Sequence, residues 1–434
     1  MSVEAKTVLP VPLRGGSMAR IAREAMRRRL RELAYGQLTV RDSWGTWLVG
    51  TPDGEVSAHI HVIDSSFYLD VALEGSLGAA RAWMDGRWHS DDPTSVLRLM
   101  LRNVDVMDRM DGGLATITSL AARLRHAVRR NSATGSRRNI HAHYDLGNDF
   151  FSLFLDESMT YSCAIFEHDD TTLEQAQFAK LERICRKLAI TSDDHVLEIG
   201  TGWGSFATHA ARHHGCRVTT TTISAEQHAL ATARVQAAGL KDRVTVLLQD
   251  YRALEGKFDK LVSIEMIEAV GHAYLPTFFA ACSRLLRDDG AMLLQGITMP
   301  DQRYARYLKA SDFIQEYVFP GSCCPALYAM LDAVRGHTDL RVAHLEDIGL
   351  HYARTLRAWH ERFDARADEV RALGYPERFM RMWRYYLAYC EAGFAERYTG
   401  TVQLLLEKPS RRAPTILGEL SETPGLSHPA QDRA

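Results

Sequence analysis

Three glycines at alternate positions follow a short aliphatic run in the segment LEIGTGWG, residues 197–204. Gly200 and Gly202 permit a tight turn in which the backbone approaches a ligand, and Gly204 lets a following helix pack against the strand. The spacing differs from the G-x-G-x-x-G pattern of dinucleotide-binding proteins, and an acid, Glu198, lies inside the strand. The segment therefore predicts a cofactor at the carboxyl edge of a sheet, near a helix N-terminus.

This glycine pattern resembles the first motif of S-adenosylmethionine-dependent methyltransferases, which implies that Glu198, Gly200, Gly202 and Gly204 bind that cofactor. Asp250 closes the third strand, where such enzymes place a side chain at the adenine. The acid that usually holds the ribose hydroxyls at the end of the second strand is missing. The segment TISAEQ stands there instead.

The T-x-S-x-x-Q pattern of that segment is similar to the one in cyclopropane-fatty-acyl-phospholipid synthases. Further landmarks of that family follow in order: HYDLGNDFF at 143–151, YSC at 161–163, EAVG at 268–271, YVFPG at 317–321, HYARTLRAW at 351–359 and RMWRYYL at 381–387. The resemblance spans about residues 138 to 408, and RAWMDGRW at 81–88 resembles the family's N-terminal domain. It implies further cofactor contacts at Tyr144, Tyr161, Ser162, Thr222, Ser224 and Gln227.

The resemblance also implies a reaction: a methyl group passes from the sulfonium to a cis double bond of a phospholipid acyl chain, inside a pocket without water. Positive charge then develops on the neighbouring carbon, and a desolvated aromatic face stabilises such charge by about 2 kcal/mol. Tyr144, Tyr317, Phe319 and Tyr352 are candidates for this role. In the family, a bound bicarbonate ion removes a proton from the new methyl group, and a cyclopropane ring closes.

By the same resemblance, the bicarbonate site consists of Cys163, Glu268, the backbone of Ile297, and Tyr352. At a fifth position the family commonly has His, in L-H-x-I, whereas this chain has Gln295. An amide exchanges hydrogen bonds with bicarbonate but does not relay a proton near neutral pH. Four of the five positions of the site are therefore kept, while the path by which the proton leaves the site is changed.

Two neighbours of the predicted site complete this comparison. Ala269 stands where E-H-V-G is commoner in the family than E-A-V-G, so a second imidazole is missing. Glu265 lies three residues before Glu268, and we interpret it as structural or as a support for the ligands.

Three other functions remain open. A related methyltransferase would act on the same alkene and produce a 10-methylene or 10-methyl branched acyl chain, an outcome that the altered Gln295 position favours. An N-methyltransferase of a small amine would share the scaffold but would not need a basic N-terminal domain. A non-catalytic lipid-binding protein would not need the intact glycines and Glu268.

Composition limits the class of protein. The chain has 434 residues, a formal net charge of -2 and 46% hydrophobic residues, which excludes disordered and collagen-like classes. Its apolar runs are much shorter than the roughly 20 residues that cross a bilayer, and no secretion signal precedes them. Seven scattered Cys favour a reducing compartment over a disulfide framework. We expect a cytoplasmic protein, peripheral to the inner face of the membrane.

Two segments are strongly basic. Residues 1–34 contain eight Lys and Arg against three Glu, and residues 115–138 contain six Arg and no acid. Residues 17–33 predict an amphipathic helix with Ile21, Met26, Leu30 and Leu33 on its apolar face and Ser17 as its cap. It is either a solvated helix packed on its own domain or a surface for anionic phosphates, with Arg27, Arg28 and Arg29 as candidate contacts. The partner implied by the resemblance is unsaturated phospholipid at a membrane, not nucleic acid, and a homodimer stays open.

The pattern of elements predicts two domains. Short alternating runs at 38–41, 47–50, 58–62 and 67–71 predict a small antiparallel sheet, followed by helices. We expect an N-terminal domain at 1–125, a linker at 126–138, a catalytic domain at 139–408 and a disordered tail at 409–434.

The catalytic part alternates strand and helix from residue 196 to residue 297, which is typical of an open α/β sheet with helices on both faces. The expected fold class is therefore α/β: a Rossmann-like methyltransferase sheet with a helical cover for the acyl chain, plus a smaller α+β N-terminal domain. The pairs His141/His143 and His213/His214 have no third ligand at zinc spacing, so we expect no metal.

Overall fold

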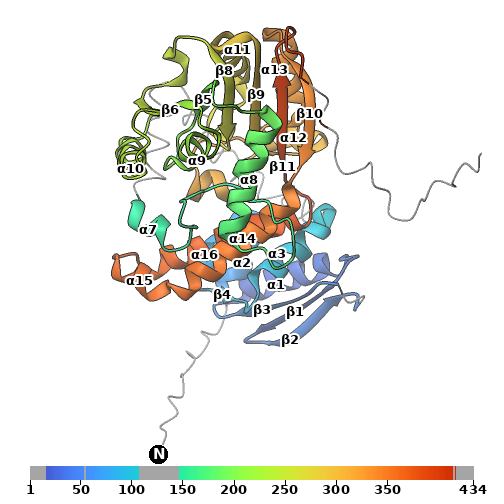
Figure 1. Ribbon diagram of the computed structural model, residues 1–434. Helices are drawn as coiled ribbons and strands as arrows, with labels where there is room; N and C mark the ends of the chain where they lie inside the picture. Colours follow the sequence, from blue (N-terminus) through green and yellow to red (C-terminus); the bar gives the residue numbers. More distant parts are fainter. Residues whose placement is uncertain (1–15, 53–54, 107–145, 414–415, 417–434) are drawn as a thin grey trace, which may run out of the picture.

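The computed structural model describes residues 16–52, 55–106, 146–413 and 416. These residues form a four-stranded sheet close to the N-terminus and a seven-stranded sheet in the rest of the chain. Long helices lie between the two sheets (Figure 1). Both helices and strands are present, as the α/β class requires.

The smaller sheet has the strand order β2-β1-β3-β4. Its strands are β1 (Gln37–Asp42), β2 (Gly45–Gly50), β3 (Ser57–Val62) and β4 (Trp88–His89), and its helices are α1 (Ser17–Leu30), α2 (Ser66–Met84) and α3 (Pro93–Arg102). Alternate residues of the strands, such as Leu38, Val40 and Ile60, are buried in one core with α2 and α3. Because successive side chains of a strand point to opposite faces, these buried residues lie on one face of the sheet, which the helices cover.

Two expectations for this region are wrong. Strand β1 pairs antiparallel with β2 but parallel with β3, so the sheet is mixed. Residues 67–71 are not a strand but part of α2, because Phe67, Tyr68 and Val71 lie on one buried face at helical spacing. The Asp64 carboxylate accepts a hydrogen bond from the backbone N–H of Ser66 where this helix begins.

Helix α1 also differs from its prediction. Gly16 occupies the N-cap and Ser17 is the first helical residue, so the Ser17 side chain does not cap the helix. Leu30 and Leu33 are buried as expected, but Ile21 is 65% exposed. The apolar face is therefore narrower than the sequence indicated, and Ile21 points to solvent among arginines.

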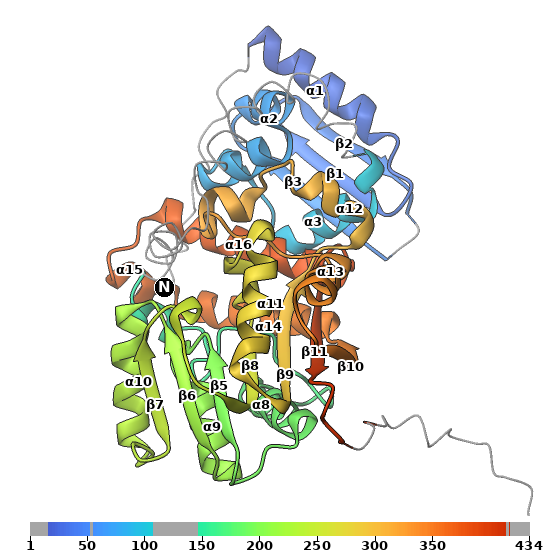
Figure 2. The same ribbon diagram turned by 90° about the horizontal axis from the view of Figure 1, so that it is seen from above.

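The larger sheet has the strand order β10-β11-β9-β8-β5-β6-β7, which Figure 2 shows from above. Its strands are β5 (His195–Ile199), β6 (Arg217–Thr222), β7 (Val244–Leu248), β8 (Phe258–Ile264), β9 (Leu286–Thr298), β10 (Arg341–Asp347) and β11 (Gly400–Glu407). The strands from β7 to β9 are parallel, and β11 runs antiparallel to both of its neighbours. The predicted alternation of strand and helix between residues 196 and 297 is confirmed.

Helices cover both faces of this sheet. The core on one face combines strand residues with α8 (Leu173–Leu188), α9 (Ser205–His214) and α10 (Ala225–Ala237). The core on the other face includes α11 (Leu275–Leu285) and α13 (Leu327–His337). The carboxyl ends of the parallel strands remain open for a ligand, as in other doubly wound sheets.

A third group of helices connects the two sheets. It consists of α7 (Asn148–Ser152), α12 (Asp301–Tyr307), α14 (Gly349–Ala365), α15 (Ala367–Ala372) and α16 (Glu377–Ala395). Helix α16 packs against α14 on one side and against α2 and α3 on the other. The Trp83 indole donates to the backbone oxygen of Arg381, whose guanidinium donates to the backbone oxygens of Trp83 and Trp88. These hydrogen bonds join the N-terminal part of the chain to helix α16.

The predicted domain boundary and the linker at 126–138 lie outside the described residues, as does most of the predicted tail. Among the described helices, none combines the length and the apolar character that crossing a membrane requires.

Candidate active site

A cavity of about 340 Å³ opens at the carboxyl ends of the parallel strands. Predicted site residues that line it are Tyr161, Ser162, Glu198, Gly200, Gly202, Thr222, Gln227, Asp250, Glu268, Ile297, Phe319 and Tyr352. The fold therefore gathers most of the predicted cofactor and bicarbonate positions around one space. Tyr144 lies outside the described residues.

The glycine turn adopts backbone angles that side chains disfavour. Gly200, Gly202 and Gly204 have φ values of +103°, +53° and +85°. A Cβ atom on Gly202 would meet no atom within 4 Å, so this backbone faces open space where a ligand fits. A Cβ on Gly204 would lie 3.3 Å from the Cβ of Ala231, so Gly204 allows α9 to approach α10 and does not line the cavity.

A family landmark lies against this turn. The Trp203 indole donates to the Asn148 side-chain oxygen of α7 at 2.7 Å, and its ring packs against Phe151. Residues 148–151 and the glycine turn at 197–204, distant in sequence, therefore pack against each other.

The segment after β6 has a structural part and a part that faces the cavity. Ser224 is the N-cap of α10 and accepts a hydrogen bond from the Gln227 backbone, and it is not among the lining residues. The Thr222 hydroxyl donates to the Gln227 side-chain oxygen at 2.8 Å, and both residues line the cavity. Asp250 also lines the cavity and accepts hydrogen bonds from the Arg252 guanidinium.

Two buried ionisable side chains, Glu198 and Lys180, lie in the cavity wall, and the charge of each affects the pKa of the other. Burial raises the pKa of Glu198 to about 8, although the Thr220 hydroxyl donates to its carboxylate at 2.6 Å. Burial also lowers the pKa of Lys180 to about 8, although the charges of Glu265 and Glu198 oppose this shift. The Lys180 ammonium donates to the Ser162 hydroxyl at 2.8 Å. Lys180 was not predicted from the sequence, where its only signal is a charged residue on the buried face of an amphipathic helix.

Glu265 is the centre of the predicted bicarbonate site. Its Oε1 accepts hydrogen bonds from the Cys163 backbone N–H and from Gln295 Nε2, both at 2.9 Å. Its Oε2 accepts one from the Tyr352 hydroxyl at 2.5 Å. Three of the five residues expected to hold bicarbonate thus donate to this carboxylate. From the sequence, we expected only a structural or supporting role for Glu265.

The backbone of Glu265 is strained. Its φ is +47°, in the left-handed region that residues other than glycine rarely adopt. Such strain persists only where the surroundings enforce it, and it concentrates at functional sites. Burial raises the pKa of the Glu265 carboxyl above its ordinary value, while the bonds from Tyr352, Gln295 and Cys163 favour the charged form.

Glu268 differs from Glu265 in its bonding. Its Oε1 accepts the backbone N–H of Ile297 at 2.5 Å, while its buried Oε2 has no hydrogen-bond partner. Burial and the charge of Glu265 raise the pKa of Glu268 to about 8. Glu265 has three donors and Glu268 Oε2 has none, so the negative charge of the pair is better stabilised on Glu265 than on Glu268.

Gln295 is held in a defined orientation. The Gln403 side-chain N–H donates to Gln295 Oε1 at 3.0 Å, and Lys187 donates to Gln403 at 2.8 Å. Gln295 Nε2 therefore turns towards Glu265 and the Cys163 backbone oxygen. The Cys163 thiol itself donates to backbone oxygens, so its predicted contribution is made by its N–H.

The predicted aromatic candidates separate into two groups. Phe319 and Tyr352 line the cavity, as does the predicted cofactor contact Tyr161, whose hydroxyl lies 2.8 Å from that of Tyr386. Tyr317 is not among the lining residues, and its ring packs against Phe313. Tyr386, which sequence reasoning did not single out, extends the aromatic wall.

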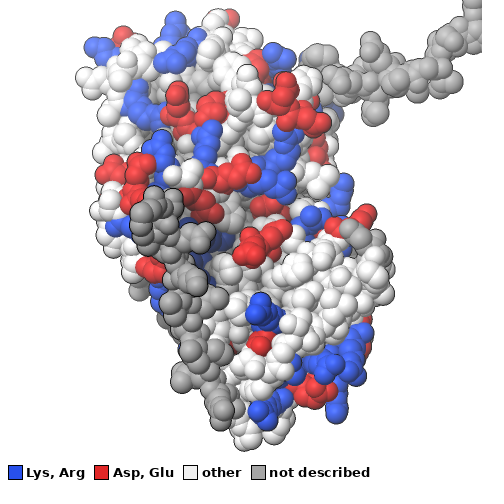
Figure 3. Space-filling view, turned by 90° about the horizontal axis from the view of Figure 1, so that it is seen from below, with Lys and Arg blue, Asp and Glu red and all other residues white. Residues whose placement is uncertain are grey.

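The predicted membrane residues lie on α1. Arg27 and Arg28 are 3.8 Å from Glu24, and Arg29 is 3.7 Å from Glu32. Figure 3 shows acidic groups interspersed with the basic ones and a broad uncharged area, rather than a continuous basic surface.

Comparisons with known proteins show which family this chain resembles. The family model of mycolic acid cyclopropane synthetase matches residues 131–404. Tuberculostearic acid methyltransferase UfaA1 of Mycobacterium tuberculosis is 40% identical over 343 residues, which cover 77% of this chain and 80% of that protein. Cyclopropane-fatty-acyl-phospholipid synthase of Escherichia coli K12 is 38% identical over 349 residues, which cover 80% of this chain and 86% of that protein.

Solved structures of cyclopropane synthases share the fold of this chain. Cyclopropane synthase MmaA2 from Mycobacterium tuberculosis superimposes with a TM-score of 0.59 at 32% identity and covers 63% of this chain and 98% of that chain. The same values hold for mycolic acid cyclopropane synthase CmaA1 in its complex with SAH and CTAB. Coclaurine N-methyltransferase, at 20% identity and a TM-score of 0.58, shares the fold alone.

Proposed function

The chain belongs to the mycolic acid cyclopropane synthetase family of S-adenosylmethionine-dependent methyltransferases, and we propose that it methylates a cis double bond in the acyl chain of a membrane phospholipid. The observation that carries this proposal is the shared cavity: the glycine turn and a buried carboxylate with three hydrogen-bond donors face the same space. A methyl donor and a proton acceptor are thereby placed within reach of one substrate.

The cavity fits the cofactor in shape and charge. Gly202 leaves its Cβ direction open, and Thr222, Gln227 and Asp250 offer polar groups along the same wall. When bound, S-adenosylmethionine supplies a methyl group on a positively charged sulfur. Tyr161, Phe319 and Tyr352 present rings to the cavity, and such faces stabilise the positive charge that follows methyl transfer to an alkene.

We further propose that Glu265 is the base. Methyl transfer leaves a positive charge on the adjacent carbon, and a proton must leave the new methyl group before a neutral product forms. Glu265 Oε2 accepts only the Tyr352 hydroxyl among the described hydrogen bonds, which leaves capacity to accept that proton. Because Cys163, Gln295 and Tyr352 already donate to Glu265, this carboxylate stands where the resemblance implied bicarbonate.

Glu268 has a different part in this mechanism. With a pKa raised to about 8 by burial and by the charge of Glu265, it is protonated near neutral pH. It therefore adds no second negative charge beside Glu265, and its unpartnered Oε2 is left to donate to a group in the cavity.

Two products are compatible with these residues. Ring closure and the formation of an exocyclic methylene after a hydride shift both remove a proton from the transferred carbon, so the position of the base does not choose between them. Relatives named cyclopropane synthases favour the ring. The 40% identity to a tuberculostearic acid methyltransferase favours the branched chain as a second candidate.

Mass spectra of fatty acid methyl esters from a bacterial host, with and without the expressed chain, test the proposal. We expect new acyl chains that are one carbon longer than the unsaturated precursors. Hydrogenation then distinguishes the products, because an exocyclic methylene is saturated under conditions that a ring survives. Unchanged acyl chains, with folded protein present, would contradict the proposed function.

Membrane association is part of the same proposal. Met18 and Ile21 on α1 are each 65% exposed, beside Arg20 and Arg28. Exposed apolar side chains next to arginines are typical of helices that lie at the surface of an anionic bilayer. The substrate's location is the inner face of the cell membrane in this account.

A further inference from the structure

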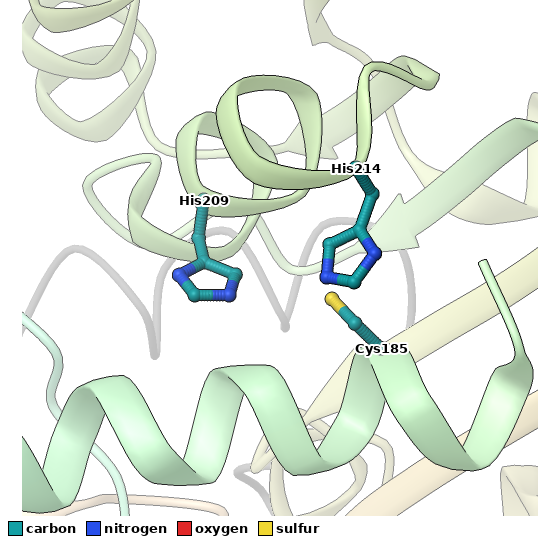
Figure 4. A group of neighbouring side chains, drawn as sticks. All are labelled: Cys185, His209 and His214. Atoms are coloured by element: carbon teal, nitrogen blue, oxygen red, sulfur yellow. The ribbon is translucent and has the colours of Figure 1, made fainter. Parts of the chain in front are cut away.

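Two helices on one face of the larger sheet bring a cysteine and two histidines together, away from the cavity. Cys185 belongs to α8, and His209 and His214 belong to α9. The cysteine sulfur and a ring nitrogen of each histidine lie within 4.8 Å of one another. Figure 4 shows the sulfur and both rings in the space between the two helices.

A carboxylate lies beside these three groups. Glu182 precedes Cys185 by about one turn of α8, and its Oε2 is 3.0 Å from His214 Nε2 and 3.3 Å from His209 Nε2. Cysteine sulfur, imidazole nitrogen and carboxylate oxygen are the ligands that zinc takes in proteins, usually four in number.

The form of cysteine that binds a metal is the thiolate. The Cys185 thiol is buried between the two helices, so an ion would have to displace its proton, as metal binding does at cysteine ligands.

We propose that Glu182, Cys185, His209 and His214 form a Zn²⁺ site. Because zinc bonds are about 2.0–2.3 Å long, the outermost of these atoms would move inward by roughly 1 Å. In the sequence, no third ligand follows the pair His213/His214 at zinc spacing, which predicted that no metal would bind. The third and fourth ligands come instead from another helix, and the exposed His213 is not part of the cluster.

A bound ion at this site would stabilise the fold and would take no part in the reaction. None of the four residues is among those lining the cavity. Helix α8 carries Gln177 and Lys180, which donate to Ser162, and α9 starts directly after the glycine turn. An ion that joins α8 to α9 would therefore stiffen two elements that support the cofactor pocket.

Spectroscopy of the metal-free protein tests this proposal. We expect one Co²⁺ per chain, with a sulfur-to-cobalt charge-transfer band that Zn²⁺ abolishes by displacement. Zn²⁺ should also raise the midpoint of thermal unfolding, because it binds only the folded state. Absence of the band in the unmodified protein, a reading that needs no variant, would overturn the proposal.

Variants identify the ligands. Cys185→Ser should remove the charge-transfer band, and His214→Gln should weaken Zn²⁺ binding by at least about 100-fold, more than the loss of an outer hydrogen-bond partner costs. His213→Gln is the matched control and should bind Zn²⁺ as the unmodified protein does. A band that persists in folded Cys185→Ser, or an equal loss in His213→Gln, would show that the ion binds elsewhere.

Discussion

Glu265 combines three properties that are rare together in one residue. It is a buried carboxylate with three donors, it has a positive φ, and it lies on the wall of the cavity at the carboxyl ends of the parallel strands. A structural acid would need the donors but not the strained backbone. The combination is that of a base whose charge and position are fixed before substrate arrives.

Replacing Glu265 by Gln tests this role. The variant keeps the shape of the side chain but removes the proton acceptor, so turnover should fall by about a thousandfold or more. The affinity for S-adenosylmethionine, measured by titration calorimetry, should change little. A variant that retains substantial turnover would show that another group takes the proton.

The pH dependence of turnover gives a second test. The base must be ionised, and burial raises its pKa, so activity should fall on acidification at a higher pH than for an ordinary carboxyl. Tyr352→Phe removes a hydrogen bond that favours the charged form of Glu265, so the pH at which turnover falls should move still higher. Turnover of this variant should recover in part at alkaline pH.

Tyr375→Phe is the control for this experiment. It also loses a hydroxyl, but its hydrogen bond goes to the Leu146 backbone and not to Glu265. An acidic limb that stays in place in Tyr352→Phe, or that moves equally in Tyr375→Phe, would contradict the assignment.

At the scale of elements, the glycine turn between β5 and α9 carries the cofactor prediction. Gly202→Val would put a branched side chain into the space that the ligand needs, and S-adenosylmethionine binding should be lost while circular dichroism shows a folded protein. Gly239→Val is the matched control, since Gly239 also has a positive φ, +70°, and open space around its Cβ direction. Equal affinities for the cofactor in both variants would refute the assignment of the turn.

The sequence predicted strands β5 to β9 and the helices between them, because strand and helix periods alternate there, but it did not predict β10 and β11. It failed at α2, where Phe67, Tyr68 and Val71 fit a strand as easily as a helix over so short a run. It also failed at Glu265, because the donors come from a loop, from β9 and from α14. Nothing local in the chain indicates that these segments meet.

At the scale of the whole molecule, α16 joins the catalytic sheet to the N-terminal part through Arg381, Trp83 and Trp88. A membrane-facing α1 would therefore hold the cavity at a fixed position relative to the lipid surface. This arrangement explains why an enzyme with a lipid substrate would keep a small domain with an arginine-rich helix beside its catalytic sheet.

Vesicle binding tests this arrangement. Replacing Arg27, Arg28 and Arg29 by Gln removes about 1 kcal/mol of attraction per charge near an anionic surface, so binding to anionic vesicles should weaken, and most at low salt. Replacing Arg335, Arg366 and Arg371 by Gln removes the same charge from other exposed ion pairs and should change binding little. Equal binding to neutral and anionic vesicles would contradict the role of α1.

The central claim, methylation of a lipid alkene with Glu265 as the base, is tested most directly with S-adenosylmethionine deuterated in its methyl group. The purified chain is incubated with vesicles of unsaturated phospholipid in buffer freed of bicarbonate, and the acyl chains are analysed by mass spectrometry. The account predicts acyl chains that carry two of the three deuterium atoms, formed without added bicarbonate and lost in Glu265→Gln. Unlabelled acyl chains, or labelling that requires bicarbonate and survives in Glu265→Gln, would contradict it.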